Sequence, residues 1–347
     1  MRVAIVVLAL LALAAPAAAQ RRDLPVPLGK GWQHADSGVI LTATLAGLPR
    51  TTLTDNGTAE RDIAAEFASP DRATVATIHI FRPALMSVPI WFDRAQTAIA
   101  LRDIYGGATP VAPLPTPFAH PGAAVASGLR QVYVPGRGKY KSTTLAVSPV
   151  GAWLVAVRLS ATTLDPAAAD AKLSALIAAI RWPTTGDSVP VAKPVGECAD
   201  GLTYHKAAAR KPDMMQALLG GAVAAGMEKD HPADATPVEY CRDPVPPTVD
   251  YAVYRAMGTS DGYTLAIADS GRIASVYKGL TLPGQPSTGG YAVTYADLDG
   301  SIATFPSFDQ LPQPQQVLDL VLGGHQPIAR TATGAGGKTG MTIGLRR

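Results

Sequence analysis

The sequence is poor in charge, and this narrows the classes of protein it can encode. Only 16% of its 347 residues are Asp, Glu, Lys or Arg, and the formal net charge is +3. Proteins that bind nucleic acid need a strongly basic surface, so we expect no nucleic-acid partner. Hydrophobic residues make up 47% of the chain, which excludes an intrinsically disordered protein. At roughly 100–200 residues per domain, the length predicts two domains.

Long apolar runs are missing after the N-terminus. The run Val3–Leu13 follows Arg2 and precedes Ala17-Ala18-Ala19, a pattern typical of a cleaved signal peptide. The run is shorter than the ~20 residues that span a bilayer, which disfavours an uncleaved anchor. We therefore expect a signal peptide over residues 1–19, cleaved after Ala19. The mature protein should be soluble, periplasmic or secreted, and without a transmembrane segment.

Cysteine is also scarce, because Cys198 and Cys241 are the only two. Neither has a CxxC partner or a nearby histidine at ligand spacing, so a redox or zinc site has little support. Two lone cysteines in an oxidising compartment most often pair. We predict a Cys198–Cys241 disulfide, with a metal pair or a reactive thiol as the alternatives.

The composition changes near residue 183. Residues 183–196 contain three prolines and no periodic apolar pattern, which is typical of a linker. All four tryptophans precede this segment, whereas eight of the eleven tyrosines follow it. We therefore predict domains over residues 24–182 and 197–325, followed by a Gly-rich tail or last strand over residues 326–347.

Both domains are predicted to combine antiparallel strands with a few helices. Asp165 and Pro166 mark the start of a helix whose apolar residues recur at helical spacing. A Pro-rich loop is expected over residues 106–122. Strands are expected at residues 73–81, 128–134, 140–147, 151–160, 238–242, 249–257, 263–268, 273–278, 291–297 and 301–305. Further helices are expected at 89–103, 213–227 and 314–322. Little strict βαβ alternation is present, so the predicted class is α+β, with one or two helices packed on each sheet.

The element order over residues 30–182, with Trp153 and a closing helix that ends Ile180-Arg181-Trp182, is similar to small α/β/α domains of the Mog1/PsbP type. The resemblance implies a binding or accessory role rather than catalysis. That family has no shared catalytic residue set, so the resemblance implies no site residues.

One segment matches the nucleophile elbow G-x-S-x-G of serine hydrolases. It is Gly258-Thr259-Ser260-Asp261-Gly262, and Asp297 or Asp319 and then His325 follow in the hydrolase order. The elbow needs a helix after the serine, but residues 263–268 alternate like a strand. We therefore predict a hairpin turn, with a hydrolase using Ser260 and His325 as the alternative.

No cofactor or metal is predicted. Residues 332–339 are one substitution from a phosphate-binding loop, but too little chain follows to form the helix that such a loop needs. The six histidines form no HxH or HExxH pair. His79 alternates with Val75, Thr77 and Phe81 and is interpreted as a histidine of a strand face.

Two features could bind a partner. Arg137, Lys139, Tyr140 and Lys141 are expected at a hairpin tip, which is either simply solvated or a patch for an anionic partner such as lipid head groups or cell-wall polymer. Tyrosines recur along the strands of the second domain and either fill its core or form an exposed contact face. These tyrosines are Tyr251, Tyr263, Tyr277, Tyr291 and Tyr295.

The sequence therefore predicts an exported, non-enzymatic protein with a binding or accessory role in the cell envelope and an unknown partner. A serine hydrolase is the alternative.

Overall fold

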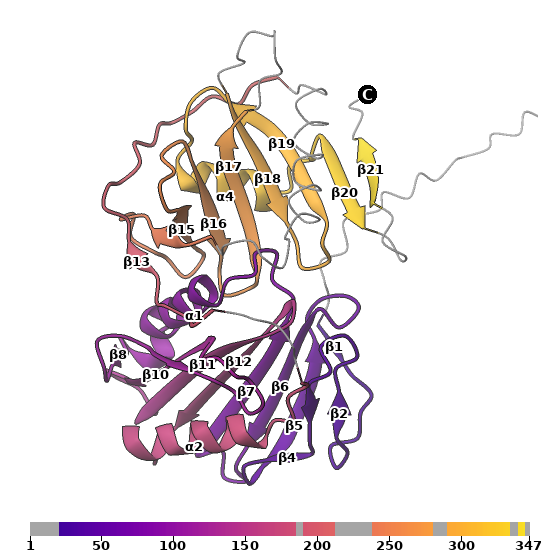
Figure 1. Cartoon of the computed structure of the whole chain (residues 1–347), viewed down its shortest axis with the longest axis vertical. Coiled ribbons are helices and arrows are strands. Elements are labelled where there is room, and N and C mark those ends of the chain that lie inside the picture. The colour runs from indigo at the N-terminus through magenta and orange to yellow at the C-terminus, as the bar shows by residue number, and fades with distance from the viewer. Residues whose placement is uncertain (1–20, 185–189, 212–237, 280–289, 334–338, 344–347) are drawn as a thin grey trace, which may run out of the picture.

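The computed structural model describes residues 21–184, 190–211, 238–279, 290–333 and 339–343. The expected signal peptide and the helix expected over residues 213–227 lie outside these residues. Two lobes are visible in Figure 1, each built on one large antiparallel sheet. Strands hold 40% of the residues and helices 15%, so the predicted α+β class is wrong and the chain is mostly β. The reason is that most strands are joined by short turns, which leave little chain for helices.

The first lobe contains a ten-stranded sheet with the order β1-β5-β6-β7-β12-β11-β10-β8, in which β4 also pairs with β5 and β9 with β10. Its strands are β1 (Arg22–Asp23), β4 (Thr44–Leu45), β5 (Leu48–Asp55), β6 (Asp62–Ala68), β7 (Thr74–Phe81), β8 (Thr109–Pro110), β9 (Thr116–Phe118), β10 (Gly128–Val134), β11 (Ser142–Val150) and β12 (Trp153–Ala161). A separate pair is formed by β2 (Trp32–Gln33) and β3 (Ile40–Leu41). The segment predicted as a Pro-rich loop therefore contains two short strands, and β8 and β9 form an edge beside β10.

Helices α1 (Val88–Leu101) and α2 (Pro166–Ala179) lie on opposite faces of this sheet. The Asp165 carboxylate caps α2 by accepting a hydrogen bond from the amide of Ala168 at 2.8 Å, as the sequence predicts. The alternation of side chains along β12 divides its apolar residues between the two faces. Val155 packs in the cluster that contains α2, and Leu154 packs in the cluster that contains α1.

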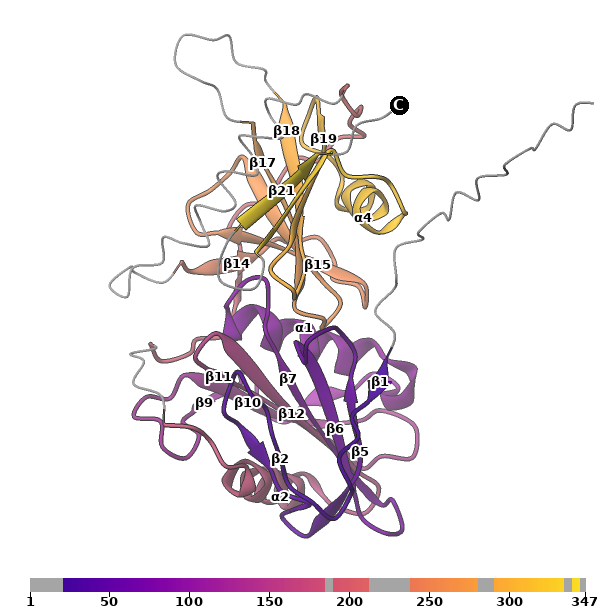
Figure 2. The same ribbon diagram turned by 90° about the vertical axis from the view of Figure 1, so that its right-hand side faces the viewer.

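The second lobe contains a nine-stranded sheet in which the strands follow chain order from β13 to β21. Its strands are β13 (Gly196–Glu197), β14 (Tyr240–Arg242), β15 (Tyr251–Ala256), β16 (Gly262–Ile267), β17 (Arg272–Lys278), β18 (Tyr291–Ala296), β19 (Ile302–Phe308), β20 (Ala329–Thr333) and β21 (Thr339–Ile343). Only β13 and β14 pair in parallel. Helix α4 (Pro314–Leu322) covers one face through Val317 and Leu318 (Figure 2).

Two predictions for the end of the chain can be compared with the last two strands of this sheet. The segment expected as a tail or last strand supplies the antiparallel pair β20 and β21. The glycines of the phosphate-loop match lie at residues 334–338, outside the described residues, and a strand rather than a helix follows them.

Helix α1 lies between the two sheets and contacts both (Figures 1 and 2). Its Trp91 and Phe92 share one buried cluster with Tyr254 and Ile273 of the second lobe. The same cluster holds Leu145 and Leu154 of the first sheet. The apolar core is therefore continuous from one lobe into the other.

Two charged residues of α1 strengthen this junction. Arg94 is fully buried and donates hydrogen bonds to the carbonyl oxygens of Ala268, Thr248 and Val249 at 2.8, 2.9 and 3.0 Å. The Asp93 carboxylate accepts hydrogen bonds from the Tyr254 hydroxyl at 2.6 Å and from Arg242 at 3.0 Å. Buried charges need such partners, so this network fixes the position of the second lobe on α1.

Candidate functional site

A cavity of about 900 Å³ opens in the second lobe beside the disulfide. Five parts of the chain line it: the segment that begins at Cys198, Cys241 of β14, the turn between β15 and β16, the facing ends of β17 and β18, and the segment that precedes α4. Its lining includes Asp200, His205, Arg255, Ser260, Lys278, Tyr291 and Asp309.

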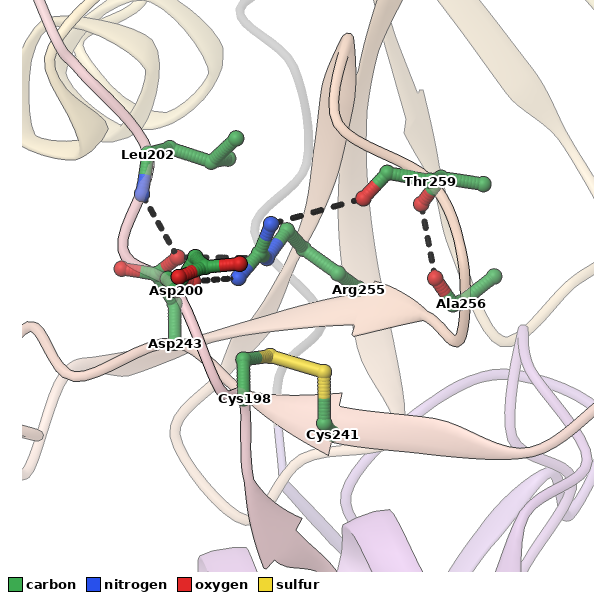
Figure 3. The surroundings of a disulfide bond; sticks show 8 residues. All are labelled: Cys198, Asp200, Leu202, Cys241, Asp243, Arg255, Ala256 and Thr259. Atoms are coloured by element: carbon green, nitrogen blue, oxygen red, sulfur yellow. Dashed lines mark hydrogen bonds and ion pairs between the residues drawn. A yellow bond between two sulfur atoms is a disulfide. The ribbon is translucent and has the colours of Figure 1, made fainter.

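The predicted disulfide is confirmed and forms part of the cavity wall. The sulfur atoms of Cys198 and Cys241 are 2.02 Å apart (Figure 3). The Cys198 amide also donates a hydrogen bond to the carbonyl of Arg242 at 2.8 Å. The covalent link and the short strand β13 together hold the segment after Cys198 against β14.

Arg255 on β15 joins two walls of the cavity. Its side chain is 7% exposed and donates hydrogen bonds to the carbonyl oxygens of Asp200 and Thr259. Its Nε lies 3.3 Å from the buried carboxylate of Asp243, which in turn accepts a hydrogen bond from the Leu202 amide at 3.2 Å (Figure 3). Removing one partner of a buried ion pair is costly, so Arg255 acts as a rigid support rather than a free charge.

The G-x-S-x-G segment is the turn between the antiparallel strands β15 and β16. Gly258 has a positive φ of +82°, which favours glycine. A Cβ atom at Gly262 would collide with the carbonyl oxygen of Val276. The two glycines are therefore explained by the hairpin, and a strand rather than a helix follows Ser260.

The structure does not bring together the residues of the predicted hydrolase alternative. Ser260 is exposed in the cavity, whereas His325 follows α4 and is not among the cavity residues. Within the described residues, no hydrogen bond joins the Ser260 hydroxyl to a histidine. The histidine that shares the cavity with Ser260 is His205, which no sequence pattern singled out.

The free charges of the cavity have both signs. Lys278 at the end of β17 faces Tyr291 at the start of β18 in the strand register. Asp309 accepts a hydrogen bond from the amide of Ala208 at 2.8 Å and so has a fixed carboxylate. Tyr204, which adjoins the cavity residues Thr203 and His205 in sequence, does not line the cavity; burial and the nearby Asp243 carboxylate raise its pKa, so its phenol stays protonated at neutral pH. The cavity thus presents an ammonium group, carboxylates, hydroxyl groups and an aromatic ring.

The predicted hairpin tip lies in the first lobe, between β10 and β11. Arg137, Lys139 and Lys141 are exposed, and the Lys139 ammonium lies 5.0 Å from the centre of the Tyr140 ring. That ring in turn lies 5.8 Å from the ring of Tyr105. The tip therefore belongs to the first lobe, whereas the cavity lies in the second.

The tyrosines of the second lobe do not form an exposed face. Tyr251 and Tyr263 are buried, and the Tyr263 hydroxyl donates a hydrogen bond to the carbonyl of Pro312 at 2.8 Å. Tyr277, Tyr291 and Tyr295 are half-buried. These residues mainly fill a core that contains few other aromatic side chains.

Two further findings concern the described part of the chain. None of its His, Cys, Asp and Glu residues gather in groups of three or more that could hold a metal ion. None of its helices combines the length and the apolar character that crossing a bilayer requires.

A scan against protein-family models, a search of curated proteins and a search of solved structures each found no match to this chain. The resemblance of residues 30–182 to Mog1/PsbP-type domains therefore stays a prediction.

Proposed function

We propose that this chain is an exported, non-enzymatic protein of the cell envelope that binds a small polar ligand in the cavity beside the disulfide. The observation that carries the proposal is the cavity itself. Its volume of about 900 Å³ lies within the usual range of ligand sites, and the disulfide and buried Arg255 hold its walls in place. Such preformed walls lower the ordering cost of binding.

The lining favours a ligand that carries hydroxyl groups and charges of both signs. The Lys278 ammonium can pair with a carboxylate of the ligand, and the Asp309 carboxylate can accept hydrogen bonds from its hydroxyl or amino groups. The Tyr291 ring offers an apolar surface beside them. Soluble muropeptides, which are sugar–peptide fragments of the cell wall, combine these groups and are the probe that we would use.

The disulfide supports export, because such bonds persist in oxidising compartments outside the cytoplasm. The apolar run at the N-terminus supports it independently.

The test is isothermal titration of the mature protein with soluble muropeptides. We expect saturable binding that weakens about tenfold in Lys278→Ala, the loss of one charge-assisted hydrogen bond. The matched control is Lys206→Ala, an exposed lysine near the cavity that does not line it, which should bind as the unsubstituted protein does. Absence of binding, or an equal loss in both variants, would contradict the proposal.

A serine hydrolase that uses Ser260 is the second candidate; the histidine in its cavity is His205, and His325, which the sequence offered, does not line the cavity. The two candidates differ in one measurement, hydrolysis of 4-nitrophenyl acetate. Binding alone predicts no turnover above that of Ser260→Ala. Turnover that Ser260→Ala and His205→Ala both abolish would favour the hydrolase.

A further inference from the structure

One edge of the first lobe combines exposed apolar and basic side chains. We call it the basic–apolar edge. Its apolar members are Leu101, Ile104, Val111, Leu114 and Val134, and its basic members are Arg137, Lys139 and Lys141. The apolar side chains are between 40% (Val134) and 66% (Leu114) exposed. A single exposed apolar residue is ordinary, but a group of them on one surface marks an interaction site.

Backbone contacts bring Ile104, Val111 and Val134 close to the basic tip, and Leu101 and Leu114 each lie three residues away in sequence from one of them. Val134 pairs with Thr109 in the edge strand β8, and Val111 donates a hydrogen bond to the carbonyl of Val132 at 2.8 Å. A Cβ atom at Gly138 would lie 2.8 Å from the carbonyl oxygen of Ile104. The basic tip and the turn that carries Ile104 are therefore in direct contact.

The charge of this edge is mostly positive. Residues 104–164 contain no Asp or Glu, although they contain five Lys and Arg residues. Two of the five, Arg130 and Arg158, form ion pairs with Asp170 and Asp269. The three cations of the tip form no ion pair within the described residues, and Asp103 is the one acidic residue in the adjoining turn.

We propose that the basic–apolar edge docks on the surface of an anionic phospholipid bilayer. Exposed lysine and arginine side chains are attracted to anionic head groups, and exposed aliphatic side chains enter the boundary between head groups and acyl chains. The unpaired cations of the edge match the anionic head groups of a bilayer, and the adjoining aliphatic side chains match the apolar layer beneath them. The edge is separate from the cavity, so docking and ligand binding can be tested separately.

The test is co-sedimentation of the mature protein with vesicles of phosphatidylcholine, with and without phosphatidylglycerol. We expect binding only to the anionic vesicles, and we expect it to weaken as salt is added, because salt screens exposed charges. The variant Arg137→Ala/Lys139→Ala/Lys141→Ala should bind about a hundredfold more weakly, since each charge contributes about fivefold. The variant Val111→Ser/Leu114→Ser should bind several-fold more weakly while keeping the salt dependence.

The matched control removes three exposed cations elsewhere, Arg21, Lys30 and Lys206, and should bind as the unsubstituted protein does. Arg21 adjoins β1, at the opposite end of the sheet from β8. Equal binding to neutral and anionic vesicles, an equal loss in the control, or sedimentation with purified peptidoglycan instead of vesicles would overturn the proposal.

Discussion

His79 on β7 lies close to the junction of the lobes and is surrounded by charges. Burial is the largest cause that lowers its pKa to about 4, and the Arg158 guanidinium lowers it further. The carboxylate of Asp269, from the second lobe, acts in the opposite direction but does not cancel the effect. His79 is therefore neutral in the folded protein at every pH near neutrality.

The titration of His79 predicts a loss of stability in mild acid. An unfolded chain protonates this histidine near pH 6.5, whereas the folded chain does so near 4, so the unfolded state binds more protons in between. Stability should be fully present above pH 6.5 and fall as the pH drops towards 4. We expect His79 to contribute at most about 2 kcal/mol to the difference between pH 7 and 4.5.

Urea unfolding of His79→Gln at the two pH values measures this contribution. The variant should lose less stability on acidification than the unsubstituted protein. His325→Gln is the matched control, because His325 is exposed, and its pH dependence should be unchanged. An identical pH dependence in all three proteins would refute the role of His79.

Single elements were predicted well where local chemistry determines them. Asp165, Pro166 and the apolar spacing that follows place α2 correctly, and the glycines around Ser260 place the β15–β16 turn. The sequence could not reveal the partners of the strands. For example, β7 pairs with β12, which follows some 70 residues later, and this pairing depends on packing rather than on local preference.

The candidate site was only partly visible in the sequence. Its two cysteines and Ser260 carry recognisable patterns, whereas His205, Lys278 and Asp309 carry none. These residues meet because β17 and β18 end beside the segment that Cys198 anchors. A cavity assembled from five separate segments leaves no residue spacing in the sequence that would predict it.

The disulfide predicts a stability that depends on redox conditions. It closes a loop between residues 43 positions apart, which stabilises the fold by about 4 kcal/mol on the chain-entropy model. Because both lobes are expected to unfold in one transition, dithiothreitol should lower the melting temperature by about 6 °C. Cys198→Ala/Cys241→Ala should melt at the lower temperature with or without reductant, and EDTA should change nothing. A shift caused by EDTA would instead indicate a bound metal.

At the scale of the whole molecule, the error in fold class has a physical cause. The α+β interpretation gave each sheet its own packing helices, but nine strands of the second lobe share α4 and, at the junction, α1. Helix α1 thus packs against both sheets, so the chain contains a smaller proportion of helix than the α+β class implies. The composition change near residue 183 indicates where the sheets divide in sequence but not that α1 joins them in space.

The hydrogen bonds of Arg94 across the junction should make the two lobes unfold in a single transition. We expect one calorimetric transition for the protein, because the apolar cluster is continuous across the junction. Arg94→Met leaves three carbonyl oxygens of the second lobe without their donor and should cost about 3 kcal/mol, with the transition splitting in two.

Arg72→Met is the control for this experiment. Arg72 forms an exposed ion pair with Glu66, so its loss should cost less than about 1 kcal/mol and leave a single transition. Two transitions in the unsubstituted protein would refute the expected coupling of the lobes.

The placement of α1 also limits how this protein can be divided or recombined. A cut through residues 183–196 would separate the sheets in sequence, yet it would take from the Arg94 guanidinium its three carbonyl partners and from Trp91 and Phe92 part of their apolar cluster. Neither piece could be transplanted to another protein as a ready-made module. A substitution at this helix therefore affects the packing of both halves.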